Sequence, residues 1–181
     1  MNIRNVCLAI LFDGDASGYE IRKKSTEGEF SYFVEASFGS IYPALARLEE
    51  EGLVTATVEQ QDGRPAKKVY SITQTGRNAF LESLYDDPGE DVFRSPFLLF
   101  ARYAEHLPAG LVGHRVKERI AMLADHIREL QDMREKFDRP ADRWVIDFGL
   151  TMQKVAEDYL RTHMSDLVGL ARQDETRDAA E

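Results

Sequence analysis

The spacing of apolar residues changes at Gly52, and this change constrains the fold more than any other feature of the chain. Before it, apolar residues recur at steps of four and three, as in the narrow stripe Ile41, Leu45 and Leu48. From 53 to 59 the chain is rich in β-branched residues and has no helical stripe, which predicts a strand. A turn with Gly and Pro at 61–65 and a second strand over 67–72 complete a hairpin.

Three helices are predicted before the hairpin and one after it. The first covers the apolar run 6–12, and the second begins after Ser17, an N-cap whose capping-box partner is Glu20. The third begins either after Ser37, another N-cap candidate, or nearer Gly39, because Pro43 suits a first turn better than a helix interior. The helix after the hairpin is capped by Thr73 or by Thr75.

This order of helix, helix, helix, hairpin and helix is the layout of a winged helix-turn-helix domain. A helix fits the major groove of duplex DNA, and a basic hairpin can reach the flanking backbone or minor groove. The alternative for the basic residues is an ordinary solvated surface. The predicted DNA-binding residues come from the second helix, the third helix and the hairpin in turn: Arg22 and Lys23; Ser37, Ser40, Tyr42, Pro43 and Arg47; Arg64, Lys67 and Lys68.

The remainder of the chain is predicted to be helical. A short helix is expected over 96–106, and two long apolar stripes at steps of three and four cover 112–137 and 145–170, separated by Pro140. Such helices carry more apolar surface than one protomer can cover, which predicts a dimer. The predicted dimerisation residues lie on both stripes: Val116, Ile120, Leu123, Ile127, Val155 and Tyr159.

The fold class is therefore mainly α with a small β-hairpin. Residues 1–85 are predicted to form the winged helix-turn-helix domain, and 86–95, with the acidic segment around Pro88-Gly89, a linker. Residues 96–172 are predicted to form a helical domain for dimerisation or effector binding, followed by a flexible tail over 173–181.

Composition excludes several other classes of protein. The single cysteine, Cys7, lies in an apolar helix and predicts a packing role, and no spacing of His or Cys suggests zinc. No glycine-rich phosphate loop, signal peptide or membrane-spanning stretch is found. We therefore expect a cytoplasmic protein that is not an enzyme, needs no metal or cofactor and does not associate with membranes.

The net charge of −9 argues at first against nucleic acid as a partner. Residues 1–85 hold 9 basic and 12 acidic residues, whereas residues 86–181 hold 14 and 20, so most of the excess acidity belongs to the second half. The hairpin 61–68 is locally basic. The charge is thus compatible with DNA binding by two small elements of modest non-specific affinity.

Four segments resemble the PadR family of bacterial transcriptional regulators. They are the sequences Gly-Tyr-Glu-Ile at 18–21, Gly-Ser-Ile-Tyr-Pro-Ala-Leu-Ala-Arg-Leu-Glu-Glu-Glu-Gly-Leu-Val at 39–54, Gly-Arg-Pro at 63–65 and Tyr-Ser-Ile-Thr-Gln-Thr-Gly at 70–76. The resemblance implies a homodimeric regulator, usually a repressor, whose C-terminal helices pair the subunits. It also implies that Tyr42, Arg47 and the basic hairpin residues face DNA. By length and helical pattern only, the C-terminal half is similar to the larger PadR subfamily.

Five aromatic residues in the second half form a further candidate site. Some members of the family respond to phenolic or other planar ligands, so the resemblance makes a pocket for a small aromatic effector plausible. The alternative is that these side chains fill the core or the dimer interface. The five residues are Phe97, Phe100, Tyr103, Trp144 and Phe148.

Taken together, the sequence predicts a homodimeric repressor that binds an imperfect palindrome in double-stranded DNA. A signal acting on the C-terminal helices would release it. The alternative function is a winged-helix adaptor that binds other proteins and no DNA.

Overall fold

The computed structural model describes residues 2–26, 30, 33, 39–61 and 64–173. The chain divides into two compact units, Met1–Val92 and Phe93–Glu181, and each is described by itself. The boundary falls inside the segment 86–95 that the sequence assigned to a linker. None of the described helices is long and apolar enough to cross a membrane.

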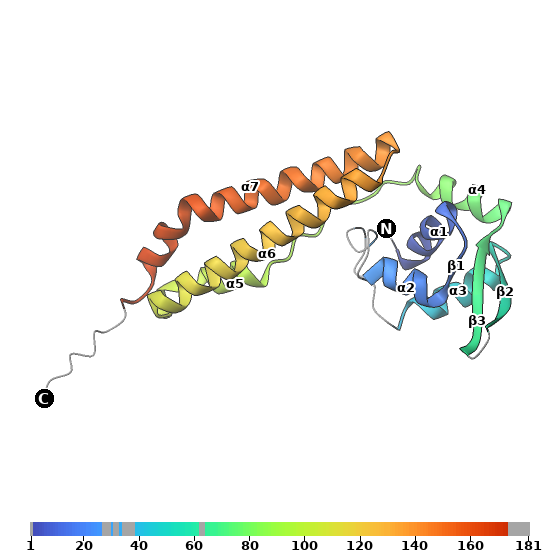
Figure 1. Cartoon of the computed structure of the whole chain (residues 1–181), viewed down its shortest axis with the longest axis horizontal. Coiled ribbons are helices and arrows are strands. Elements are labelled where there is room, and N and C mark those ends of the chain that lie inside the picture. The colour runs from blue at the N-terminus through green and yellow to red at the C-terminus, as the bar shows by residue number, and fades with distance from the viewer. Residues whose placement is uncertain (1, 27–29, 31–32, 34–38, 62–63, 174–181) are drawn as a thin grey trace, which may run out of the picture. The chain divides into compact units, whose positions relative to one another are not determined.

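In the described residues of the first unit, four α-helices follow the predicted order (Figure 1). They are α1 (Ile3–Asp13), α2 (Gly18–Thr26), α3 (Ile41–Glu50) and α4 (Gln74–Ser83). The capping box before α2 is confirmed, because the Ser17 N–H donates to Glu20 Oε2 over 2.8 Å and Ser17 Oγ accepts from the Glu20 N–H over 3.3 Å. Thr73 rather than Thr75 caps α4, since its Oγ1 accepts from the Gly76 N–H over 3.0 Å.

Helix α3 begins later than a Ser37 cap would require. Its first residue is Ile41, after Ser40, while Ser37 lies outside the described residues. Pro43 is therefore the third helical residue. The Ala44 N–H donates to the Ser40 carbonyl over 3.2 Å as the first i to i−4 bond, so the missing N–H of Pro43 belongs to a position that makes no such bond. The later start removes the cost of an interior proline.

A glycine ends α3 where the spacing of apolar residues changes. Gly52 adopts φ +70°, its N–H donates to the Glu49 carbonyl, and the Leu53 N–H donates to the Leu48 carbonyl over 2.9 Å. This pair of bonds is the Schellman motif, and the left-handed residue it needs is best supplied by glycine. The chain then enters the sheet directly.

The sheet has three strands, one more than the sequence predicted. Strands β2 (Val54–Gln61) and β3 (Arg64–Ile72) form the expected antiparallel hairpin, called the wing below, with a bulge between Glu59 and Gln61. Strand β1 (Ala16–Ser17) pairs with the other edge of β3, giving the order β1-β3-β2. A strand of two residues is too short to show an alternating pattern, so sequence periodicity could not reveal it.

The core of the first unit lies between the sheet and the helices. The predicted stripe of α3 is fully buried there, together with five residues of α1: Val6, Cys7, Leu8, Ile10 and Leu11. At the base of the wing, Thr73 joins the core to α4, because its N–H donates to the Leu53 carbonyl over 3.0 Å and its Oγ1 lies 3.1 Å from the same oxygen. A Cβ atom on Gly76 would lie 2.0 Å from that oxygen, so only glycine fits this junction.

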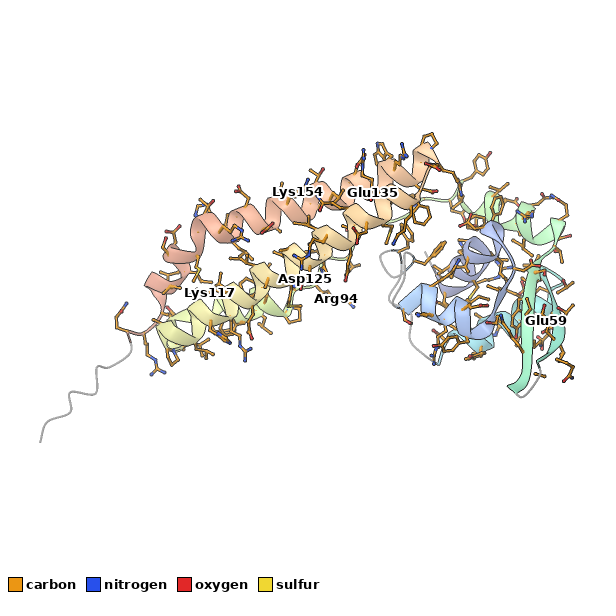
Figure 2. All side chains as sticks on the ribbon, viewed as in Figure 1. Glu59, Arg94, Lys117, Asp125, Glu135 and Lys154 are labelled. Atoms are coloured by element: carbon orange, nitrogen blue, oxygen red, sulfur yellow. The ribbon has the colours of Figure 1, made fainter. Side chains whose placement is uncertain are left out.

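The second unit is a helical hairpin preceded by a short helical segment (Figure 1). Helix α5 (Pro96–Arg102) is capped by Ser95, and a 3-10 turn η2 (Ala104–His106) replaces the last turn of the single helix predicted over 96–106. Helices α6 (Ala109–Lys136) and α7 (Pro140–Leu170) are about 42 and 46 Å long at 1.5 Å per residue. Charged side chains such as Lys117, Asp125 and Glu135 are exposed along α6 (Figure 2).

Both ends of the hairpin are fastened. At the α6–α7 turn, Arg134 pairs with Asp147, and Arg143 Nε donates to the Phe137 carbonyl over 2.9 Å. At the opposite end, the Ala109 N–H donates to the Arg172 carbonyl over 2.8 Å. The two helices are thereby held in one register along their whole length.

Four of the predicted dimerisation residues are wrongly assigned. They lie on the face of α6 that packs within the protomer and are at most 8% exposed, so a second chain cannot reach them: Val116, Ile120, Leu123 and Ile127. The stripe on α6 was correctly predicted, but it is buried within the protomer, and its residues Ile127 and Leu130 pack with Ile146 and Leu150 of α7. Val155 and Tyr159, on α7, are exposed.

Candidate nucleic-acid interface

The exposed face of α3 carries the residues that could enter a DNA groove. Tyr42, Pro43 and Arg47 are exposed, whereas their neighbours Ile41 and Leu45 are fully buried. Ser40 lies half-buried just before the first turn. An arginine and a tyrosine on the outer side of a buried helix can donate hydrogen bonds to base edges or to phosphate.

Tyr42 also packs against the start of α2. A Cβ atom on Gly18 would lie only 2.7 Å from Tyr42 Cε1, so the absence of a side chain at Gly18 makes room for the tyrosine ring. Half of Tyr42 remains exposed. The residue therefore fixes α3 against α2 and still presents polar surface to solvent.

Helix α2 contributes an arginine held by an aromatic ring. The Arg22 guanidinium carbon lies 4.9 Å from the centre of the Tyr19 ring, and Tyr19 itself is exposed. Lys23 is exposed and Arg22 is half-buried. Sequence reasoning missed Tyr19, although the spacing of three between Tyr19 and Arg22 places them on the same face of a helix.

Each lysine of the wing faces a carboxylate from a helix of the first unit. Lys67 Nζ lies 3.2 Å from Glu20 Oε1 on α2, and Lys68 Nζ lies 2.7 Å from Glu49 Oε2 on α3. Neighbouring residues of a strand point to opposite faces, which explains why the two lysines reach different helices. Arg64 begins β3 next to the tip of the wing, and its side chain lies outside the described residues.

These contacts change the pKa values of the groups involved. Hydrogen bonds from the hydroxyl and N–H of Ser17, together with Lys67, lower the pKa of Glu20 to about 2. Glu49 raises the pKa of Lys68, chiefly through their hydrogen bond. These two shifts favour the charged forms of Glu20 and Lys68, and both wing lysines are paired with carboxylates of the same protein. The sequence analysis predicted these lysines but not their acidic partners.

Helix α7 exposes a second apolar face besides the one packed on α6. Its exposed residues follow one another at steps of four, four, three and four, while Ile146 and Leu150 face the hairpin interior. The exposed fractions run from 56% to 70% along this face, which we call the α7 face: Trp144, Phe148, Met152, Val155 and Tyr159.

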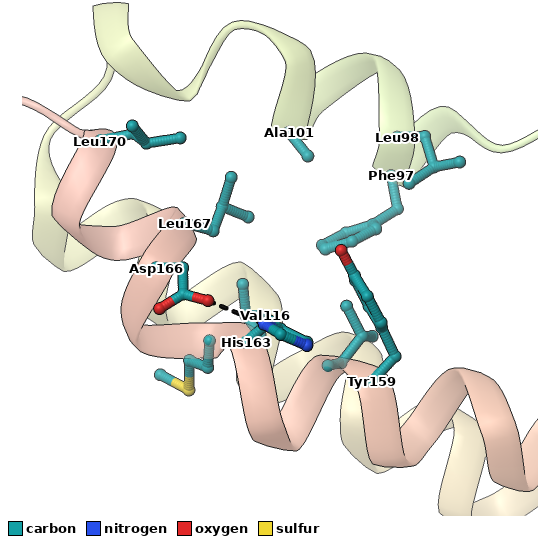
Figure 3. Close-up of a pocket in the computed structure, with 11 residues that line it drawn as sticks. Phe97, Leu98, Ala101, Val116, Tyr159, His163, Asp166, Leu167 and Leu170 are labelled. Atoms are coloured by element: carbon teal, nitrogen blue, oxygen red, sulfur yellow. Dashed lines mark hydrogen bonds and ion pairs between the residues drawn. The ribbon is translucent and has the colours of Figure 1, made fainter.

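A cleft lies between α5 and the C-terminal half of α7 (Figure 3). Its volume is about 270 Å³, and its wall is mostly apolar. At one side the Nδ1 atom of His163 lies 2.8 Å from Asp166 Oδ2, and the rings of His163 and Tyr159 are 4.5 Å apart. The apolar lining includes Phe97, Leu98, Ala101, Val116, Leu167 and Leu170.

One chain does not bring the five predicted aromatic residues together. Phe97 lines the cleft with Phe100 beside it, their ring centres 6.4 Å apart. Trp144 and Phe148 stack on each other 6.1 Å apart, but Trp144 precedes Tyr159 by fifteen residues of α7, which is about 22 Å. Tyr103 lies beside His106 instead. A single pocket formed by all five residues within one protomer was therefore a wrong prediction, because helical stripes do not show how far apart two aromatic residues lie along the axis.

Cys7 is fully buried in α1, and burial raises the pKa of its thiol to about 12. A thiol of that pKa holds almost no thiolate at neutral pH and packs as a small apolar side chain. Across the described part of the chain, no group of three or more His, Cys, Asp or Glu side chains could hold a metal ion.

Comparison with known proteins connects this geometry to one family. The model of the transcriptional regulator PadR-like family matches residues 7–82. The chain is 26% identical over 141 residues to the negative transcriptional regulator PadR of Bacillus subtilis, covering 77% of each chain.

Solved structures agree over nearly the whole chain. The PadR-like transcriptional regulator BC1756 from Bacillus cereus superimposes with a TM-score of 0.78 at 30% identity, covering 91% of this chain and 94% of that chain. Bacillus subtilis PadR in complex with operator DNA gives a TM-score of 0.74 at 24% identity, covering 91% and 98%. The same protein with p-coumaric acid gives 0.67 with the same identity and coverage. These last two likenesses concern the fold.

Proposed function

Because this chain belongs to the PadR-like family of transcriptional regulators, we propose that it represses transcription as a homodimer bound to an operator. The observation that carries the proposal is the exposed face of α3, with Tyr42 and Arg47 outside a buried core, beside a wing with basic residues. Two facts about the B. subtilis relative support it: that protein is named a negative regulator, and it has been solved with operator DNA.

In the proposed complex, the first turns of α3 enter the major groove. Arg47, Tyr42 and Ser40 contact base edges or fix the helix on the backbone, and Pro43 lies in the same turn. Lys67, Lys68 and Arg64 bind phosphates near the flanking minor groove. Arg22 and Lys23 of α2 add phosphate contacts, and Ser37 remains a predicted contact before α3.

The proposed dimer forms through the α7 face. Five large apolar residues exposed on one side of one helix form a surface that water solvates poorly and a second copy can cover. A two-fold axis would place the two α3 helices roughly 34 Å apart, one turn of B-DNA. An operator with that symmetry is an imperfect palindrome.

The proposed release signal is a small aromatic molecule bound in the cleft between α5 and α7. The cleft combines apolar walls with the polar groups of His163 and Asp166, as small-molecule sites commonly do. The complex of the B. subtilis relative with p-coumaric acid supports this class of ligand. Binding there would change the geometry of the helical unit and hence the spacing of the two wings.

A gel shift with the gene's own upstream region tests DNA binding. Arg47→Ala should weaken operator binding by about fivefold or more, because one arginine-to-base contact contributes about 1–3 kcal/mol. Reversal of both wing lysines to Glu should weaken binding to every sequence and flatten the salt dependence by about one to two units. Lys154→Ala, on the exposed side of α7, serves as the control and should leave affinity unchanged.

Failure of the wild-type protein to shift any genomic fragment would favour the adaptor function instead. The effector is tested separately by thermal shift against a panel of aromatic acids. Stabilisation should disappear in His163→Ala, whose side chain is on the cleft wall. Stabilisation by none of the acids would remove the cleft from the mechanism.

A further inference from the structure

The pairing of the wing lysines has a consequence for how tightly the protein holds DNA. A DNA phosphate that binds Lys68 must displace or share Glu49, which already lies 2.7 Å from the ammonium group. The carboxylate and the phosphate compete for the same donors, and they repel each other if both stay close. The lysine is therefore already bound to an anion before DNA arrives.

The pair is exposed enough for this exchange to occur. The Lys68 and Glu49 side chains are 48% and 37% exposed, and ion pairs of that kind change an equilibrium constant by about fivefold or less. The Lys68 ammonium also lies 5.2 Å from the centre of the Tyr70 ring, which keeps the stem of the lysine near the wing. DNA can thus remove the lysine from Glu49 at a small but measurable cost.

We infer that Glu49 is an affinity-setting residue, which occupies Lys68 in the free protein as an internal competitor of the DNA phosphate. The inference rests on the proposed function, since it needs the wing to touch DNA. Phosphate contacts are the same for all sequences, so the competitor lowers affinity for operator and unrelated DNA by the same factor. It therefore lowers the fraction of the protein that is bound to DNA of unrelated sequence.

Glu49 is a cleaner position for the test than Glu20, the partner of Lys67. Glu20 also accepts hydrogen bonds from the N–H and hydroxyl of Ser17 and so forms part of the cap of α2. Its replacement would disturb the helix as well as the lysine. Glu49 is in the last turn of α3, and its neighbour Glu50 is exposed and carries the same charge, which provides a matched control.

The experiment measures the fluorescence anisotropy of two labelled duplexes, the upstream region and an unrelated sequence of equal length, at four salt concentrations. Glu49→Gln in the full chain should tighten binding to both duplexes by about threefold to fivefold and leave the salt slope nearly unchanged, because Lys68 contacts a phosphate in both proteins. Glu50→Gln removes one negative charge from the same helix turn but leaves the ion pair of Lys68 with Glu49 in place. It should tighten binding less than twofold and leave the salt slope unchanged. In a Lys68→Gln background, Glu49→Gln should act no more strongly than Glu50→Gln.

The opposite role for Glu49 is that it braces the wing in the shape that DNA needs. In that case Glu49→Gln would weaken binding, and that sign overturns the inference, as would an effect equal to that of Glu50→Gln. If Lys68→Gln weakens binding while Glu49→Gln does nothing, the proposed function stands and only the inference fails. If the wild type binds neither duplex, both fail. If the wild type binds and Lys68→Gln changes nothing, Lys68 is outside the interface and the inference fails, while the proposed function is tested by Arg47→Ala. Melting temperatures of all variants show whether each one is folded.

Discussion

Helices α3 and α7 use their apolar residues in opposite ways. On α3, Ile41, Leu45 and Leu48 are fully buried, and the outward side carries Tyr42 and Arg47. On α7, one apolar face packs on α6 while the α7 face, from Trp144 to Tyr159, remains exposed in the protomer. Helix α3 thus buries its apolar stripe inside the first unit, whereas α7 retains an apolar face that a partner can cover.

The two units therefore depend on different contacts, one on contacts within the chain and the other, in the proposed dimer, on contacts between chains. Folding of the first unit relies on close contacts within one chain, such as the junction of Leu53, Thr73 and Gly76. The proposed activity of the second unit relies on contacts between chains. A substitution at this junction should therefore act on stability, and one on the α7 face should act on assembly.

The largest expected effect comes from Phe148→Asp combined with Val155→Asp, which places two charges on the α7 face. The proposed dimer should dissociate, and operator affinity should fall by at least about 100-fold, because two linked DNA-binding units gain about 10² to 10⁴ in avidity. Light scattering and anisotropy measure the two effects. Helix content should be retained, since both side chains are exposed.

Lys154→Ala is the control for this variant, because Lys154 is exposed on α7 outside the apolar face. A double Asp variant that stays dimeric at micromolar concentration would assign assembly to another surface.

Gly76→Ala tests how strongly the stability of the first unit depends on close packing at the base of the wing. The added methyl group would lie 2.0 Å from the Leu53 carbonyl oxygen, so the base of the wing must shift. We expect the free energy of unfolding of the first unit to fall by about 2 kcal/mol, as overpacking commonly causes. Denaturant unfolding followed at signals from each unit measures it.

Gly14→Ala is the matched change, since a methyl group there meets no atom within 4 Å. Equal loss of stability in the two glycine variants would show that the junction is not tightly packed.

Acid should act on the first unit through Glu20. Its pKa lies at about 2 in the folded protein against an ordinary 4.5, so its contribution to stability is complete above pH 4.5 and is lost as the pH falls towards 2. Because the side chain is half exposed, Glu20→Gln should cost only about 1 kcal/mol at pH 7. The variant should also lose less stability than the wild type between pH 5 and pH 2 in unfolding experiments.

The smallest effect is expected for Gly149→Ala in α7. A methyl group there would lie 3.6 Å from Leu130 Cδ1, an ordinary contact, so the close helix crossing that a glycine suggests at this position is absent. The helix should gain about 0.5–1 kcal/mol of stability, because alanine favours the helical state over glycine. A lower melting temperature would show that the two helices lie closer than this contact allows.

Local chemistry made most of the first unit predictable from sequence. The capping box at Ser17 and the apolar stripe of α3 each depend on residues a few positions apart, and both are confirmed. The pairing of β1 with β3 joins positions more than fifty residues apart, such as Ala16 and Tyr70, and no local sequence pattern predicts it.

The site was less predictable for the same reason. The exposed side of α3 follows from helical spacing, but the ion pair of Lys68 with Glu49 depends on where the hairpin lies against the helix. Similarly, an apolar stripe indicates that a helix face is covered and does not identify the covering helix. That is why Val116 and Leu123 belong to the protomer interior rather than to a dimer surface.

The wing is a β-hairpin that is held at its base by the core of the first unit. Its base is clamped where Thr73 meets the Leu53 carbonyl, and its ladder is regular from Val54 opposite Ile72 up to Glu59 opposite Lys67. At the bulge between Glu59 and Gln61 the register shifts by one residue, and Gln61 then pairs with Arg64. A hairpin fixed in this way keeps its described strands in register with α3, because any movement of the wing has to turn about the junction at Thr73.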